Sequence, residues 1–171
     1  MTEAFVGVGS NLDPETNVVE GLRRLGAATR LCGVSTFYRT APIGSPGAPP
    51  FANGAVRIET DLPPRALQFE LLRSIEAAVG RVRVADRNAP RTLDLDLLLC
   101  GEAVVREADF RLPAPELFER PFVAFPVLEL APALRLPGDG RALAEVVRGM
   151  SRAGMEPLPG LTRRARAEVA G

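Results

Sequence analysis

Two aspartates separated by a single residue are the strongest chemical feature of this chain. Asp94 and Asp96 alternate with leucines, which occupy every second position from Leu93 to Leu99. The alternation predicts a strand with leucines in the core and both carboxylates on its other face, about 6.6 Å apart along the strand. Unpaired charges are costly to bury, and hard oxygen ligands select Mg²⁺ or Mn²⁺, so the pair predicts a divalent metal site. A solvent-facing edge strand with two decorative aspartates is the alternative.

Four arginines precede these carboxylates closely in the sequence. Arg91 stands three residues before Asp94, and Arg81, Arg83 and Arg87 precede it closely. The planar guanidinium binds phosphate oxygens bidentately, so a metal pair beside arginines indicates phosphate chemistry. A solvated charged loop is the alternative interpretation of these four arginines.

Composition excludes several classes of function. The chain has no histidine and no lysine, which excludes a P-loop lysine, Ser-His-Asp catalysis and the usual zinc sites. Zero net charge offers no field for nucleic acid or membranes. Cys32 and Cys100 are far apart and predict reduced thiols. With 171 residues and no signal-peptide pattern, we expect a single cytoplasmic domain covering 1–171.

The elements that must position these residues follow a regular order. Strands are expected over 4–9, 34–39, 53–61 and the carboxylate segment, with a short return strand over 103–105. One helix is expected from Pro14, capped by Asp13, to near Gly33, and another from Pro63 and Pro64 to Gly80. In the helix from Pro63 to Gly80, the side chains expected to face the core are Leu67, Leu71, Ile75 and Val79. The order predicts an α+β, ferredoxin-like sandwich: a split β-α-β repeat with an antiparallel sheet and extra helices over 115–131 and 141–150.

Gly7-Val-Gly9-Ser10-Asn11 superficially resembles a phosphate loop. It lacks the third glycine of the dinucleotide fingerprint, and the chain has no lysine. We interpret it as a tight strand-to-helix turn. The alternative is that the glycines let the backbone approach a ligand closely.

Several segments together resemble one family, the 6-hydroxymethyl-7,8-dihydropterin pyrophosphokinases of folate biosynthesis. The most specific segment is Pro-Arg-Thr-Leu-Asp-Leu-Asp-Leu at 90–97. The supporting segments occur in the family's order over about residues 4–135: 9–12, 35–42, 51–53, 75–76, 80–83, 112–113 and 119–122.

The resemblance implies transfer of pyrophosphate from ATP to the pterin's hydroxymethyl oxygen, with release of AMP. It implies two Mg²⁺ ions bound with ATP at Asp94 and Asp96, and catalytic roles for both aspartates, Arg81 and Arg91. The implied ATP-binding residues are Glu76, Arg81, Arg83, Arg91 and Arg120. The implied pterin-binding residues are Thr40, Pro42, Ile43, Phe51, Asn53 and Phe122, with the two phenylalanines stacking on the ring. ATP and the pterin are the expected partners of a monomer or weak dimer, without nucleic acid or membrane.

Three departures from the family pattern lead us to expect a slower or less tightly closed enzyme. Ala114 replaces a common histidine that contacts nucleotide phosphate, Asn88 replaces an aromatic residue, and Val84 replaces a basic one. A non-catalytic paralogue that binds nucleotide or pterin therefore remains an alternative. Another two-metal enzyme, such as a nuclease, is a third hypothesis.

Overall fold

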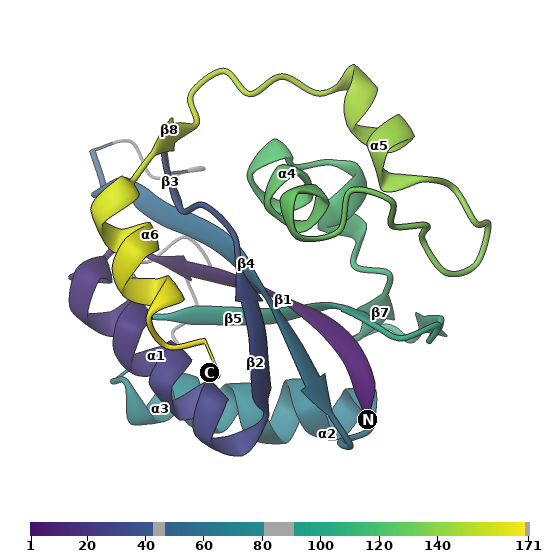
Figure 1. Ribbon diagram of the computed structural model, residues 1–171, viewed down its shortest axis with the longest axis horizontal. Coiled ribbons are helices and arrows are strands. Elements are labelled where there is room, and N and C mark those ends of the chain that lie inside the picture. The colour runs from purple at the N-terminus through teal and green to yellow at the C-terminus, as the bar shows by residue number, and fades with distance from the viewer. Residues whose placement is uncertain (43–46, 81–90, 170–171) are drawn as a thin grey trace.

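A six-stranded antiparallel sheet lies between two layers of helices in the computed structural model (Figure 1). The structure describes residues 1–42, 47–80 and 91–169. The strands are β1 (Thr2–Ser10), β2 (Arg30–Val34), β3 (Tyr38–Thr40), β4 (Phe51–Thr60), β5 (Asp94–Cys100), β6 (Val105–Arg106), β7 (Arg111–Leu112) and β8 (Glu156–Pro157). The helices are α1 (Pro14–Ala28), α2 (Pro64–Ala66), π-helical η1 (Leu67–Leu72), α3 (Arg73–Ala78), α4 (Pro121–Leu130), α5 (Leu143–Val146) and α6 (Pro159–Arg166), with 3-10 turns η2 (Pro115–Phe118) and η3 (Val147–Gly149).

The strand order confirms the ferredoxin-like α+β prediction. The sheet runs β5-β1-β4-β3-β8, and β2 also pairs with β4. β4 is thus inserted between β1 and the strand that follows α1, which is the split β-α-β arrangement. The single strand expected over 34–39 is wrong: β2 and β3 pair with successive stretches of β4 and are interrupted at 35–37. β6 pairs with β7, in a separate two-stranded sheet.

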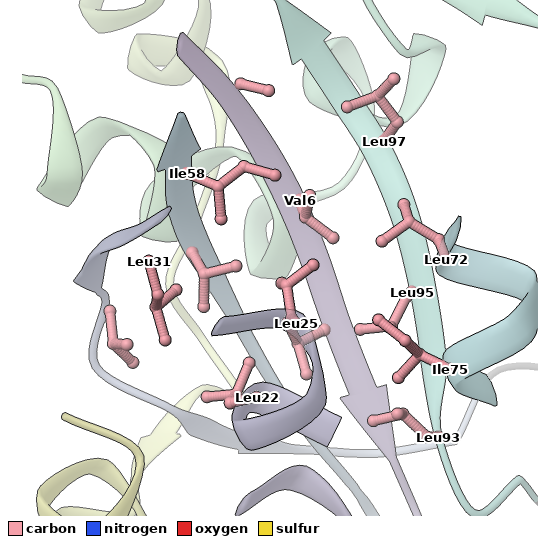
Figure 2. Packing of buried hydrophobic residues seen from close by; sticks show 14 of the residues in the cluster. Val6, Leu22, Leu25, Leu31, Ile58, Leu72, Ile75, Leu93, Leu95 and Leu97 are labelled. Atoms are coloured by element: carbon pink, nitrogen blue, oxygen red, sulfur yellow. The ribbon is translucent and has the colours of Figure 1, made fainter. Parts of the chain in front are cut away.

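The segments α2, η1 and α3 follow one another without a break and are together called the second helix. The first hydrophobic cluster fills the space between the sheet and the layer formed by α1, the second helix and α6. Figure 2 shows Leu95 and Leu97 of β5, and Leu93 just before it, beside Leu72 and Ile75 of the second helix. The predicted inward row of leucines is therefore confirmed as far as Leu97. Burying each such side chain stabilises the fold by roughly 1.5–3 kcal/mol.

Leu99 departs from the predicted alternation because β5 contains a bulge. Phe5 of β1 lies opposite Leu99, whereas Val6 lies opposite Leu97. Leu98 is therefore an extra residue, and such a bulge reverses the faces that later side chains take. Leu98 and Leu99 both join the second hydrophobic cluster, under α4 and α5.

Three helical expectations also need correction. α1 ends at Ala28, not near Gly33, because the chain enters β2 at Arg30. Asp13 occupies the N-cap position but has a left-handed backbone and makes no side-chain cap hydrogen bond. In the second helix, the π-helical turn η1 moves the core-facing position from Leu71 to Leu72. Its backbone hydrogen bonds span five residues instead of the four of an α-helix, so the next core position comes one residue later.

The C-terminal segment was not predicted, and it holds the region between β2 and β3. β8 pairs with β3, and α6 packs against α1 and β2. The hydroxyl of Thr162 accepts a hydrogen bond from the Phe37 amide at 2.9 Å, and the Leu158 amide donates to the Phe37 carbonyl at 2.8 Å. Within the described ranges, no helix has the length and apolar character needed to cross a membrane.

Candidate active site

Both aspartates of β5 lie opposite glycines of β1. Asp94 pairs with Gly9 and Asp96 with Gly7, and Asn53 of β4 lies on the far side of Gly9. Cross-strand partners project to the same face of a sheet, so the missing side chains leave an opening over β1. A pocket of about 160 Å³ occupies this opening, with both carboxylates and Asn53 in its lining.

This arrangement overturns our interpretation of the glycine segment as a turn. Gly7 and Gly9 are interior residues of β1, which continues to Ser10. A Cβ atom on Gly9 would lie 2.9 Å from the Asn53 Oδ1 atom. The absence of a side chain at Gly9 therefore gives the Asn53 amide its space.

The turn that follows β1 positions Arg91. The Asn11 Oδ1 atom accepts a hydrogen bond from the Arg91 amide at 2.6 Å. The amides of Asn11 and Leu12 donate to the Arg91 carbonyl at 3.1 and 3.2 Å. The Gly-Ser-Asn-Leu segment thus fixes the backbone of an arginine 80 residues later in the chain.

Arg91 in turn pairs with one of the two carboxylates. Its Nη1 atom lies 3.1 Å from the Asp94 Oδ2 atom, and the side chains are 23% and 22% exposed. Asp96 is more exposed than Asp94. The sequence predicts two anions that are costly to bury, whereas in the structure Asp94 is only partly buried and Asp96 is exposed.

The opposite wall comes from η2 and the start of α4. Arg120 and Phe122 both line the pocket, and the Arg120 guanidinium carbon lies 6.0 Å from the centre of the Phe122 ring. The Ala114 amide donates to the Leu98 carbonyl at 3.0 Å, which ties this wall to β5. Cationic and aromatic groups therefore face the carboxylates across one small pocket.

The other candidate pterin-binding residues lie nearby but not all in this pocket. The Asn53 amide donates to the Thr40 hydroxyl at 2.7 Å, and Phe51 is the β4 partner of Thr40. Thr40 and Pro42 line a neighbouring pocket of about 350 Å³ together with Arg39 and Glu156. Ile43, Arg81, Arg83, Val84, Arg87 and Asn88 lie outside the described residues.

Glu76 is placed apart from the pocket. Its side chain is almost fully buried, and its Oε2 atom accepts a hydrogen bond from the Leu95 amide at 2.7 Å. Gln68 accepts the Leu97 amide in the same way, also at 2.7 Å. Both side chains bind outward-facing amides of β5, which is an edge strand of the sheet. They thereby hold the strand that carries the two aspartates.

Sequence reasoning missed two residues of this region. Gln68 gave no signal beyond being a polar residue next to a core leucine. Glu116 of η2 lines the carboxylate pocket, and its only sequence signal was its position four residues before Arg120. Ala114, at the position of the family's histidine, is buried in the second hydrophobic cluster.

The donor set suits magnesium. Within the part of the chain that the structure describes, no group of three or more histidine, cysteine or acidic side chains could hold a metal ion. Asp94 and Asp96 supply two hard carboxylates on one face. Mg²⁺ commonly uses one or two carboxylates and completes its octahedron with water and substrate phosphates, so these residues fit that ion.

Comparison with known proteins identifies the family. The model of the 7,8-dihydro-6-hydroxymethylpterin-pyrophosphokinase (HPPK) family matches residues 5–132. The chain belongs to this family. The matched range contains all the residues that line the carboxylate pocket. It also removes the nuclease hypothesis.

Curated relatives support the HPPK assignment over most of the chain. A 2-amino-4-hydroxy-6-hydroxymethyldihydropteridine pyrophosphokinase of Pseudomonas aeruginosa is 41% identical over 91% of this chain and 96% of its own length. The Synechocystis enzyme of the same name is 34% identical over 92% and 82%, respectively. A folic acid synthesis protein of Pneumocystis carinii is 30% identical over 82% of this chain, which corresponds to 19% of that protein.

A solved structure shares the fold. A crystal structure of an HPPK-DHPS protein in complex with substrates superposes with a TM-score of 0.61 at 12% identity. The similarity covers 85% of this chain and 42% of that one. At this identity the likeness supports the ferredoxin-like fold of the family and no residue assignment.

Proposed function

We propose that the pocket over Gly7 and Gly9 transfers the pyrophosphoryl group of ATP to 6-hydroxymethyl-7,8-dihydropterin and releases AMP. The observation that carries the proposal is the placement of Asp94 and Asp96 opposite two glycines, beside Arg91 and facing Arg120. Phosphoryl-type transfer depends on positioning and electrostatic stabilisation more than on a nucleophilic side chain. A chain without histidine or lysine can therefore carry it out.

Asp94 and Asp96 would hold two Mg²⁺ ions together with ATP. When bound, such ions neutralise the charge of the phosphate oxygens and orient them. Arg91 and Arg120 flank the same pocket and would bind phosphate oxygens from opposite walls. We extend this role to Arg81 and Arg83 because they precede Arg91 closely in the sequence. Glu76, the other implied ATP-binding residue, would act indirectly, because its buried carboxylate holds the strand that carries both aspartates.

The pterin would occupy the side of the pocket formed by Asn53 and Phe122. Phe122 offers a ring face, and Asn53 offers an amide that can both donate and accept hydrogen bonds. Phe51, two residues before Asn53 in β4, would supply the second ring, with Thr40, Pro42 and Ile43 completing the site. We place the reaction in the cytoplasm, where ATP is abundant and the two free cysteines stay reduced, and expect a monomer or weak dimer.

The test is to incubate the purified chain with ATP, Mg²⁺ and 6-hydroxymethyl-7,8-dihydropterin and to separate the nucleotides by chromatography. Pterin-dependent AMP is the expected product. Pterin-dependent ADP would mean that single phosphoryl transfer occurs and that the proposed reaction is wrong. Pterin binding by calorimetry without any nucleotide product would favour the non-catalytic paralogue.

A further inference from the structure

Glu116 is the third carboxylate of the pocket, and the family resemblance gives it no role. It lines the wall formed by η2 and α4, together with Arg120 and Phe122, and faces the β5 side that carries Asp94 and Asp96. We propose that Glu116 is the general base that accepts the proton of the pterin's hydroxymethyl group. This proposal rests on the proposed function and adds a catalytic residue to it.

The position of Glu116 is fixed by its neighbours. Its carbonyl accepts hydrogen bonds from the amides of Glu119 and Arg120 at 3.2 and 2.9 Å, which closes the 3-10 turn and leads into α4. The next residue, Leu117, is fully buried in the second hydrophobic cluster. The Ala114 amide ties the start of the turn to β5. A carboxylate on such a braced turn can be held in a productive geometry.

The side chain of Glu116 is available for substrate. It is partly buried, and within the described ranges its carboxylate makes no hydrogen bond and no ion pair. It also does not form a three-acid metal group with Asp94 and Asp96 among the described residues. A partly buried carboxylate that neither pairs with an arginine nor joins the metal ligands is suited to accept a hydrogen bond from a bound ligand.

Few other groups in the pocket could accept this proton. The chain has no histidine or lysine, so carboxylates are the available bases among the described lining residues. Asp94 is paired with Arg91, and both β5 aspartates are assigned to magnesium. Oxygen lone pairs that bind a metal are poorly basic. Glu116 is the described acid that remains, with Arg120 beside it on the same wall.

The chemical step balances without another reactant. The hydroxymethyl O–H donates its proton to the Glu116 carboxylate as the oxygen attacks the β-phosphorus of ATP. An O–P bond forms, and the bond between the β-phosphorus and the oxygen bridging to the α-phosphorus breaks. The electron pair leaves with AMP, and Glu116 then releases the proton to solvent. General bases of this kind accelerate reactions by roughly 10²- to 10⁴-fold, and the aspartate of protein kinases accepts a substrate hydroxyl proton similarly.

The decisive comparison uses Glu116→Gln, Glu116→Asp and the control Glu119→Gln. Glu119 is an exposed acid that follows the same turn and is not among the residues lining the pocket. In single-turnover measurements, we expect Glu116→Gln to lower the rate of AMP formation by about 100-fold. The Kd for the pterin and for Mn²⁺ with a non-hydrolysable ATP analogue should stay within about threefold. Glu116→Asp should recover part of the rate, and Glu119→Gln should match the unmodified chain.

Three results would overturn the role of Glu116. The single-turnover rate of Glu116→Gln could stay within about threefold of the unmodified rate. The affinity for Mn²⁺ could fall with the rate, which would make Glu116 part of the metal's environment. The affinity for the pterin could fall enough to account for the lost rate, which would make Glu116 a binding residue. If the unmodified chain itself forms no AMP, the proposed function fails; if it does form AMP, any of these results removes only the inference about Glu116.

Discussion

The two faces of β5 carry opposite chemistry at alternate residues. Leu93, Leu95 and Leu97 are almost fully buried against the helical layer, whereas Asp94 and Asp96 face the pocket over β1. The leucines fix where the strand lies, and the aspartates use that position. Under the proposed function, alternate residues of one strand serve stability and activity, so substitutions on the two faces should separate the two properties.

The outer edge of β5 affects both faces of the strand. The outward amides of Leu95 and Leu97 are bound by Glu76 and Gln68 of the second helix. An edge strand without a partner has unpaired backbone groups and a weakly specified register. These two side chains satisfy the groups and hold the strand, so the edge contributes to both stability and site geometry.

The largest effect should come from Asp96 on the polar face. Asp96→Ala removes one of the two proposed metal ligands, and we expect AMP formation to fall at least about 1000-fold, which corresponds to about 4 kcal/mol. Because Asp96 is exposed, the free energy of unfolding in urea should change by less than about 0.5 kcal/mol. Pterin binding without ATP should persist in calorimetry.

Glu102→Ala provides the matched control for Asp96→Ala. Glu102 is an exposed acid in the turn directly after β5, and its removal should leave both activity and stability unchanged. Loss of pterin binding in Asp96→Ala would contradict the division of the pocket into a metal side and a pterin side.

The apolar face should respond in the opposite way. Leu95→Ala removes a fully buried side chain from the first cluster and should lower the free energy of unfolding by about 2–5 kcal/mol. The folded fraction should keep its AMP-forming rate within a few-fold, because the pocket lies on the other face. Leu62→Ala, at an exposed leucine, should change neither. A stable but inactive Leu95→Ala protein would show that the two faces are not separable.

Local sequence patterns were sufficient to predict the fold, the strand β5 and the type of chemistry at its polar face. Period-two alternation indicated β5, and Asp94 and Asp96 with Arg91 indicated the phosphate chemistry. The helix-strand order gave the split β-α-β fold because each element has its own hydrophobic period. The carboxylate pocket itself required one more fact, the register that places glycines of β1 opposite both aspartates. Register depends on pairing between distant segments, so alternation within one strand did not contain it.

The errors have similar physical causes. A bulge at Leu98 and a π-helical turn before Arg73 each insert one residue into a regular period. They arise from the fit between packed elements, so the leucine spacing continued to favour Leu99 and Leu71 as core positions. Glu116 was missed because a single carboxylate in a short turn has no periodicity. Its position depends on the tertiary fold, which brings η2 to the pocket that Asp94 and Asp96 line.

A smaller effect should test the edge of β5. Gln68→Leu keeps a similar volume but removes the acceptor of the Leu97 amide, which would leave a buried donor unpaired. We expect a loss of about 1–3 kcal/mol in the free energy of unfolding, measured by urea denaturation. AMP formation should fall by a few-fold as the strand loosens. Glu70→Ala, an exposed position on the same helix, is the control. Unchanged stability in Gln68→Leu would mean that the Leu97 amide finds another acceptor and that the hydrogen bond to Gln68 is dispensable.

The smallest effect should come from Gly7 and Gly9 of β1, which form the floor of the pocket and can be compared directly. A Cβ atom on Gly9 would lie 2.9 Å from the Asn53 Oδ1 atom, so Gly9→Ala must displace an amide that now donates to Thr40. A Cβ atom on Gly7 would meet the flexible side chain of Leu98 at 3.4 Å. We expect calorimetry to show a Kd for the pterin that rises by about 10-fold in Gly9→Ala and less than about twofold in Gly7→Ala, which corresponds to about 1.4 kcal/mol against less than about 0.4 kcal/mol. Equal losses of pterin affinity in both variants would place the pterin over both glycines. This would contradict the proposal that the pterin lies on the side of the pocket formed by Asn53.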